Sequence, residues 1–225
     1  SLRSLGWGGS DTVAGVADSV CLSHRQAAAL LAEAAAWPGL EYLQLALKPP
    51  EPGEPEEYLG AAVAAVAPRL PALRGLRLEY AFLDAGGCHA LASATWAALE
   101  RLALTSCFMP DEDFGALCAA PAERFPALRA LDFSGCDLEG SSDAIAVLLE
   151  TFGARLVYLN LSGCEIRNAV LASLAMAALP LLETCNLASN GIGDSGARLL
   201  ARTPPGRMPR LQLLDLRGNF VSDAA

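Results

Sequence analysis

Seven cysteines and two histidines carry the most reactive side chains of this 225-residue chain, since thiolates and imidazoles serve as nucleophiles, bases and metal ligands. Their spacing favours none of these roles. No Cys-x-x-Cys pair is present, so a zinc site has little support. His24 and His89 lie far apart, and no pattern predicts a Ser-His-Asp or Cys-His arrangement. An odd cysteine count without a disulfide pattern favours a reducing compartment.

Other chemical motifs are also absent from the sequence. No G-x-x-x-x-G-K-[ST] loop occurs, and Gly6, Gly8 and Gly9 have no helix immediately after them, which fits an irregular terminal repeat better than a phosphate cradle. Asp132 and Asp215 occupy equivalent positions three repeats apart and are not a catalytic pair. We therefore predict a protein that is not an enzyme, with no catalytic residue, cofactor, metal or small-molecule substrate.

Three cysteines instead share one position in a repeated phrase, Leu-x-x-Leu-x-Leu-x-x-Cys/Asn-x-Leu. This position holds Cys107, Cys136 and Cys164 in three copies and Asn190 and Asn219 in the next two. These copies begin at residues 99, 128, 156, 182 and 211, and weaker copies begin at 2, 40 and 73. Such self-similarity is the signature of a leucine-rich repeat solenoid, and a period near 28 leaves room for a strand and a helix in each repeat.

The strands of these repeats must be parallel, because a helical crossover separates each strand from the next. We predict strands near residues 43–45, 76–78, 102–104, 131–133, 159–161, 185–187 and 214–216. Inward leucines such as Leu131, Leu159 and Leu187 should be buried between neighbouring repeats. Helices are predicted after the capping residues 141–143, after the acidic run 111–113, after 191–196, and through 62–67, 170–175 and 27–37.

This reasoning predicts one α/β horseshoe, with parallel strands on the concave face and helices on the convex face. Residues 1–225 should form a single domain of about eight repeats, irregular within 1–72. Residues 221–225 resemble the start of a helix that then stops, so we expect the chain to be an excerpt of a longer protein. A solenoid needs terminal caps, and the isolated fragment is expected to associate or to gain stability when extended.

Charge and hydropathy limit the partners. The net charge of −9 argues against a nucleic-acid binder, leaving only the cluster from Arg198 to Arg217 as a site for phosphates. No apolar run reaches the length of a membrane span, and no signal peptide is visible. We expect an intracellular location, in the cytoplasm or, as the alternative, in an organelle. The acidic, proline-rich segment 48–57 is predicted to be an extended surface loop, either a tolerated insertion or a contact for a partner.

Alternation along the strands identifies the side chains that should line the concave face, where solenoids commonly bind other proteins. The outward columns are small and polar, with two tyrosines. The candidate partner-binding residues are Tyr42, Gln44, Arg77, Glu79, Arg101, Asp132, Tyr158, Asn160, Asn186, Asp215 and Arg217. The face lacks the crowded aromatic and arginine anchors typical of hot spots, so loops and edges remain alternative contact surfaces.

The chain resembles the ribonuclease-inhibitor-like class of leucine-rich repeat proteins, strongly over 73–225 and weakly over 2–72, as the phrase at 156–166 illustrates. The resemblance implies that the Cys/Asn position bonds loop backbone of its own or a neighbouring repeat. It also implies a non-catalytic scaffold for protein–protein interaction, a subunit of a larger assembly. The alternative is a recognition or GTPase-activating subunit serving an enzyme, as in F-box receptors, innate immune sensors or the Ran GTPase activator.

Overall fold

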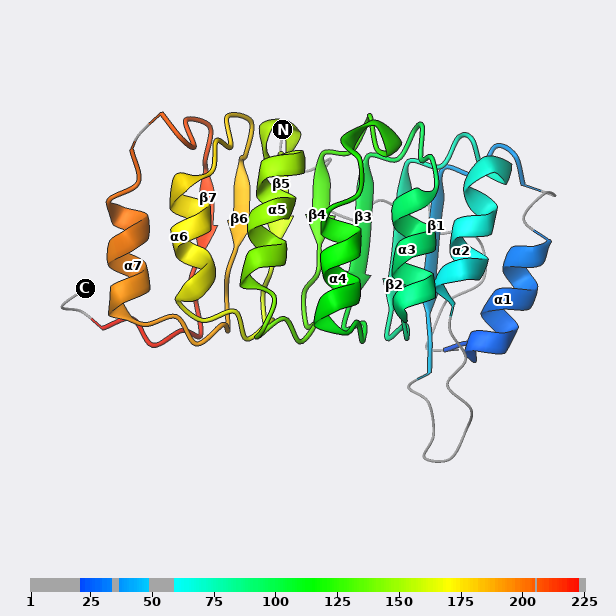
Figure 1. The fold of residues 1–225 in the computed structure, drawn as a ribbon, viewed down its shortest axis with the longest axis horizontal. Coiled ribbons are helices and arrows are strands. Elements are labelled where there is room, and N and C mark those ends of the chain that lie inside the picture. The colour runs from blue at the N-terminus through cyan, green and yellow to red at the C-terminus, as the bar shows by residue number, and fades with distance from the viewer. Residues whose placement is uncertain (1–20, 34–36, 49–58, 205, 223–225) are drawn as a thin grey trace.

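Strands and helices alternate along the chain in the computed structural model, which describes residues 21–33, 37–48, 59–204 and 206–222. The strands in this part of the chain are β1 Tyr42–Ala46, β2 Gly75–Glu79, β3 Arg101–Thr105, β4 Ala130–Asp132, β5 Tyr158–Asn160, β6 Thr184–Asn186 and β7 Leu213–Asp215. They form one sheet in the order of the sequence, and every pair is parallel. Figure 1 shows them side by side behind a row of helices, with the arrowheads toward the lower edge.

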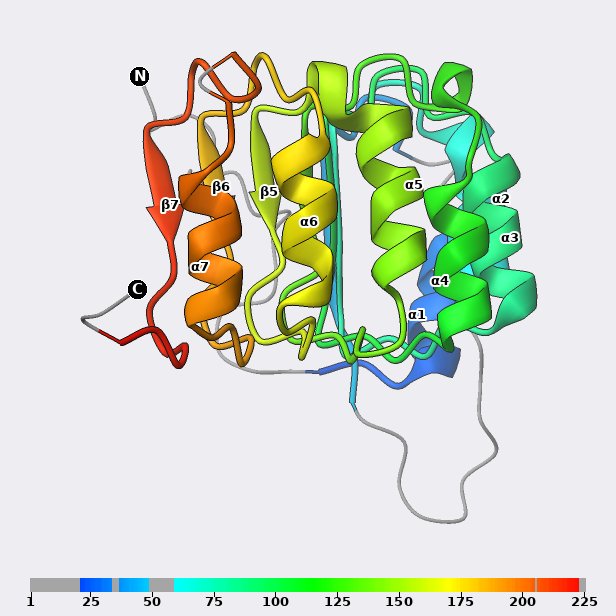
Figure 2. The ribbon, with the colours of Figure 1, turned by 60° about the vertical axis from the view of Figure 1, so that its left-hand side comes forward.

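The helices form a second layer over one face of the sheet, as the turned view in Figure 2 shows. They are α1 His24–Ala32, α2 Gly60–Val66, α3 Ala85–Ser93, α4 Asp111–Cys118, α5 Ser142–Phe152, α6 Ala169–Met176 and α7 Asp194–Ala201, with short 3₁₀ helices η3 Ala67–Arg69, η4 Ala122–Arg124 and η5 Gly153–Arg155. The opposite sheet face is called the concave face below. Within the described ranges, no helix has the length and apolarity needed to cross a membrane.

The core lies between the two layers and continues from repeat to repeat. Leu131, Leu159 and Leu187 are 2%, 0% and 0% exposed, as the stacked-repeat interpretation predicts. On the helix side, Val170, Leu171 and Leu174 of α6 are buried in the same continuous cluster. Each helix therefore covers leucines that its own strand cannot bury alone, which confirms the predicted α/β solenoid.

The last four strands lie one residue earlier than predicted. Residues 131–133, 159–161, 185–187 and 214–216 were expected, whereas the strands occupy 130–132, 158–160, 184–186 and 213–215. The cause is the Asp or Asn at the third strand position. Its side-chain oxygen accepts a hydrogen bond from the N–H two residues later and turns the chain out of the sheet.

The residue immediately before the Cys/Asn position has a backbone in the left-handed region, with positive φ. In six consecutive repeats φ at this place lies between +51° and +73°, at Tyr80, Ser106, Gly135, Gly163, Ser189 and Gly218. Glycine adopts this conformation without strain, and other residues do so at a cost. The turn geometry is therefore common to all six repeats, although glycine occupies only half of them.

Some sequence-based predictions need correction or fall outside the structure. The helix predicted over 27–37 begins earlier, at His24, because Ser23 and Gln26 form a capping box, and it ends at Ala32. Ser141 is the N-cap residue of α5, as predicted, but its hydroxyl makes no capping hydrogen bond and instead donates to Asp111 Oδ1 at 2.7 Å. The repeat predicted to start at residue 2, with Gly6, Gly8 and Gly9, and all of the loop 48–57 beyond Lys48 lie outside the described residues.

Candidate interaction surface

Three rows of side chains cross the concave face, because all strands pair in register. The middle row runs Gln44, Arg77, Ala103, Asp132, Asn160, Asn186, Asp215. A second row contains Tyr42, Arg101 and Tyr158, and a third, toward the strand ends, contains Glu79 and, two residues beyond Asp215 of β7, Arg217. The fold thus brings the eleven candidate residues onto one sheet face. Their role in binding a partner stays a prediction.

Four of the candidates also have a structural task. Asp132, Asn160, Asn186 and Asp215 each accept a hydrogen bond from the N–H two residues later, at 2.9–3.0 Å. Asp132 and Asn160 are buried, so the middle of this face is less solvated than the sequence suggested. Each side chain is held in one orientation by its own turn, which leaves its second polar atom in a fixed position.

Ion pairs fix both ends of the face. At the β1–β2 end, Glu79 binds Arg77 and accepts from Gln44 Nε2 at 3.3 Å. At the β7 end, Arg217 forms a bidentate pair with Asp215 (2.6 Å), and its side-chain and backbone hydrogen bonds lower the pKa of Asp215 to about 2. In the chain alone, the charge of Glu79 is therefore paired with that of Arg77, and the charge of Asp215 with that of Arg217.

Tyr158 lies near the centre of the face and is half-buried. Burial, followed by the nearby carboxylate of Asp132, raises the pKa of its phenol. The side chain therefore remains a neutral donor over the physiological range, and presents an aromatic ring with a polar tip.

The cysteines of the repeated phrase form an internal hydrogen-bond ladder. In each repeat, the side chain at the Cys/Asn position donates to a backbone carbonyl of the preceding repeat. The acceptor is the residue at the third Leu position of the phrase. The bonds are Cys107 to Leu78 (3.5 Å), Cys136 to Leu104 (3.1 Å), Cys164 to Phe133 (3.1 Å), Asn190 to Leu161 (2.6 Å) and Asn219 to Leu187 (2.9 Å). This confirms the contact to a neighbouring repeat that the family resemblance implied.

Six of the seven cysteines are buried, and this burial suppresses the reactivity of their thiols. It raises the pKa of Cys88, Cys136 and Cys185 to about 12 and also raises the pKa of Cys107, Cys118 and Cys164. All seven thiols are free in the structure. No group of three His, Cys, Asp or Glu side chains within the described ranges is placed to hold a metal ion.

The two histidines do not meet. His24 is buried at the start of α1, where its Nε2 accepts the N–H of Phe82 at 3.1 Å, while His89 is exposed on α3. His24 therefore fastens α1 to the loop after β2. Sequence spacing does not indicate this contact, which joins residues 58 positions apart.

The arginine cluster is also divided by the fold. Arg198 and Arg202 belong to α7 and its C-cap, and Arg207 and Arg210 precede β7. Arg217 follows β7 and is paired with Asp215. A strand separates Arg210 from Arg217, so the five side chains do not form one phosphate-binding patch.

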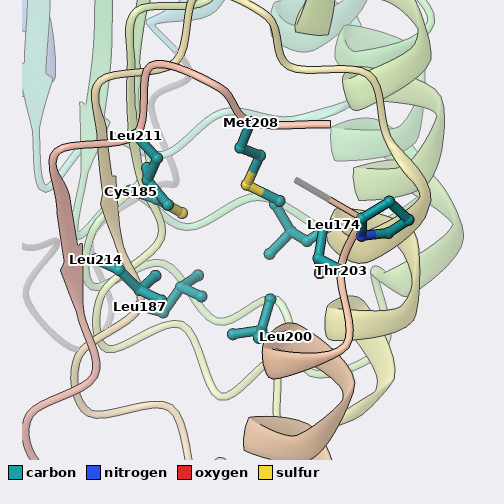
Figure 3. Close-up of a pocket in the computed structure, with 9 residues that line it drawn as sticks. Leu174, Cys185, Leu187, Leu200, Thr203, Met208, Leu211 and Leu214 are labelled. Atoms are coloured by element: carbon teal, nitrogen blue, oxygen red, sulfur yellow. The ribbon is translucent and has the colours of Figure 1, made fainter. Parts of the chain in front are cut away.

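An apolar pocket of about 150 Å³ opens at the β7 end, and Figure 3 shows its lining. Leu174, Cys185 and Leu187 line it together with Leu200 and Leu214 (Figure 3). Outside the pocket, Leu213 and Phe220 are 52% and 80% exposed, and Leu214 itself is 38% exposed. The core is thus less covered at this end than in the preceding repeats.

The comparison with protein families supports the repeat assignment over one repeat. A leucine-rich repeat sequence profile matches residues 179–201, which contain β6 and α7. No curated protein matches the chain significantly. Similar solved structures include a protein from Bacteroides fragilis (16% identity, TM-score 0.49, 91% of this chain and 68% of that one), the TLR13–ssRNA13 complex (17%, 0.43, 84% and 31%) and the LRIM1/APL1C complex (14%, 0.34, 91% and 49%).

The parallel strands, the crossover helices and the inward ladder at the Cys/Asn position define an α/β solenoid of stacked repeats. The described chain has the α/β solenoid fold of stacked repeats, and residues 179–201 match the leucine-rich repeat family.

Proposed function

We propose that this chain is a non-catalytic scaffold for protein–protein interaction, a subunit of a larger intracellular assembly, and that the concave face binds its partner. The observation that carries the proposal is the register of the polar rows. Seven in-register strands present side chains that the turns and ion pairs already hold in place. A preorganised surface loses less entropy when a partner binds.

The dimensions of this surface suit a protein segment. Seven strands at the usual spacing of parallel strands extend over roughly 29 Å. The polar groups are spread along the rows instead of converging on one point, which is the reverse of a small-molecule pocket. The buried, protonated thiols support both a non-catalytic role and a reducing, intracellular environment.

Site-specific photocrosslinking tests the proposal. A photoreactive phenylalanine analogue replaces Tyr42 or Tyr158 on the concave face, and in matched controls Val147 or Met176, which are exposed on the helices. We expect the same protein to be crosslinked in cells from both concave positions and from neither helical position. Equal yields from the helical positions, or different proteins at 42 and 158, would contradict a concave binding site.

A further inference from the structure

Two phenylalanines from consecutive repeats stack at the edge where the strands end. Phe82 follows β2 and Phe108 follows β3, with ring centroids 4.5 Å apart and planes inclined by 23°. A parallel bridge joins the two residues, and the N–H of Phe108 donates to Ala81 O at 2.9 Å. Phe108 is nevertheless 52% exposed. The backbone therefore holds an aromatic surface open to solvent.

A pocket of about 470 Å³ adjoins this stack, between the loops that follow β3 and β4. Phe108 lines it together with Asp111, Asp137 and Glu139, whose side chains are exposed, and Gly140. Asp111 uses Oδ1 to accept from Ser141, and Glu139 pairs with Arg167 at 2.7 Å. An aromatic wall and carboxylates thus line the same small depression.

The loops around this pocket are rich in carboxylates, and Arg167, paired with Glu139, is a cation beside them. Residues 80–84, 106–113 and 133–143 contain seven carboxylates (Asp84, Asp111, Glu112, Asp113, Asp137, Glu139 and Asp143) and no Lys, Arg or His. Burial, with the charges of Asp84 and Glu112, raises the pKa of Asp113, in keeping with repulsion among these groups. At the opposite edge of the sheet the connecting loops carry Arg69, Arg74, Arg124, Arg129, Arg155, Arg207 and Arg210.

We propose that the edge formed by residues 80–84, 106–113 and 133–143 binds an arginine-containing segment of a partner protein. The guanidinium stacks on the exposed ring of Phe108, and Asp111 and Asp137 accept its hydrogen bonds. Arginine fits better than lysine because its planar group can stack on an aromatic ring and bond two carboxylates at once. The negative potential repels phosphates, so a nucleic acid does not fit this edge. The inference rests on the proposed role in protein binding but places this contact on a separate surface.

Peptide titrations test this inference. Fluorescein-labelled Gly/Ser peptides carrying either arginines or the same number of lysines are titrated with the purified chain, and binding is followed by fluorescence anisotropy. We expect the arginine peptide to bind more tightly than the lysine peptide. Phe108→Leu, which keeps an apolar side chain but removes the ring, should weaken the arginine peptide by about three- to fivefold.

Two further variants separate the pocket from general charge attraction. In Asp111→Asn/Asp137→Asn the hydroxyl of Ser141 still finds an acceptor, and binding of both peptides should weaken. Gly140→Ala leaves the charge unchanged, but its new Cβ would overlap Oδ2 of Asp111 and should also weaken the arginine peptide. Glu123→Gln and Glu183→Gln, at the opposite edge, are the matched controls and should leave binding unchanged.

Equal affinity for the two peptides, together with no effect of Phe108→Leu, would overturn the proposal and indicate charge attraction alone. Loss of binding in the Glu123 and Glu183 controls would overturn it equally. Thermal melting of each variant checks that the fold is intact. None of these substitutions lies on the concave face, so failure here leaves the photocrosslinking result independent, and the reverse also holds.

Discussion

Asn190 and Cys164 occupy the same position in adjacent repeats, and Asn190 Oδ1 accepts the backbone N–H of Cys164 at 2.9 Å. Both side chains donate to the preceding repeat, Cys164 to Phe133 O and Asn190 to Leu161 O. A thiol sulfur accepts only weakly, whereas the amide oxygen is a strong acceptor, so Asn190 joins two repeats through three backbone groups, including the more distant N–H of Ile166 at 3.5 Å. The later repeats therefore have stronger hydrogen bonds in this ladder than those built on cysteine.

This difference predicts unequal costs of substitution. Asn190→Ala leaves a buried carbonyl and a buried N–H without partners and should lower the free energy of unfolding by about 2–4 kcal/mol. Asn190→Cys keeps a donor and should cost about half as much, and Cys164→Ala, which removes one weak donor, about 1 kcal/mol. Urea denaturation of the three variants measures the order, and equal losses for Asn190→Ala and Asn190→Cys would show that the accepting bonds contribute little.

The stacked core predicts a large effect at Leu159. This side chain is fully buried in the middle of the sheet, so Leu159→Ala should lower the free energy of unfolding by about 2–5 kcal/mol. Leu213 belongs to the same sheet but is 52% exposed, and Leu213→Ala should change the value by about 0.5 kcal/mol or less. An unchanged denaturation midpoint for Leu159→Ala would contradict a core that continues between repeats.

The buried thiols predict a loss of stability in alkali. The pKa of Cys136 is raised to about 12 in the folded chain, against about 8.5 in the unfolded one. Its contribution is therefore complete below about pH 8.5 and falls as the pH rises toward 12, because only the unfolded chain releases the proton. The free energy of unfolding of Cys136→Ala should decline less steeply than that of the wild type between about pH 8 and pH 10.

Leu213→Ala, which removes no ionisable group, provides the control for that measurement and should keep the wild-type slope. The same samples test the thiol state: we expect Cys136 and Cys164 to be reduced and free of metal. A Cys136–Cys164 bridge in mass spectra of fresh protein, or stoichiometric zinc, would contradict this.

The positive φ of the residue before the Cys/Asn position predicts that glycine there makes the fold more stable than other residues do. Gly163 has φ of +65°, and a Cβ added to it would lie 3.8 Å from the nearest atom, so Gly163→Ala should cost about 1–2 kcal/mol through backbone conformation alone. Ser106, at the equivalent place with φ of +51°, should give a more stable protein as Ser106→Gly. Gly39→Ala, in open space with an ordinary φ, is the control and should be neutral or slightly stabilising, and a similar loss there would refute the argument.

The exposed apolar end predicts self-association. Leu213, Leu214 and Phe220 all belong to the last described repeat and are exposed, and exposed apolar side chains of this kind can mediate contacts or aggregation. Sedimentation velocity should show concentration-dependent association that Phe220→Asp reduces and that Met176→Asp, at an exposed methionine on α6, does not. Fusing a further designed repeat after residue 225 should raise the melting temperature. A monomer at high concentration that gains nothing from the fusion would show that this end is adequately covered.

The spacing of the leucines alone determined the class of fold, the parallel order of the strands and the burial of residues such as Leu159, because a period-2 strand within a 28-residue repeat permits one stacked arrangement. The same spacing placed the eleven candidate residues on a common face. It also aligned the cysteines with Asn190 and Asn219, although the partners of these side chains came from the resemblance to known repeats.

Tertiary structure alone decided the contacts that cross repeats. It showed that Asp132 and its equivalents end the strands early, that His24 holds Phe82, that Phe82 stacks on Phe108, and that Arg210 and Arg217 are separated by β7. These relationships depend on how each loop leaves its strand and on how one repeat sits upon the next. A sequence period records neither, because it specifies which face a residue occupies and not the direction in which a loop carries its side chains.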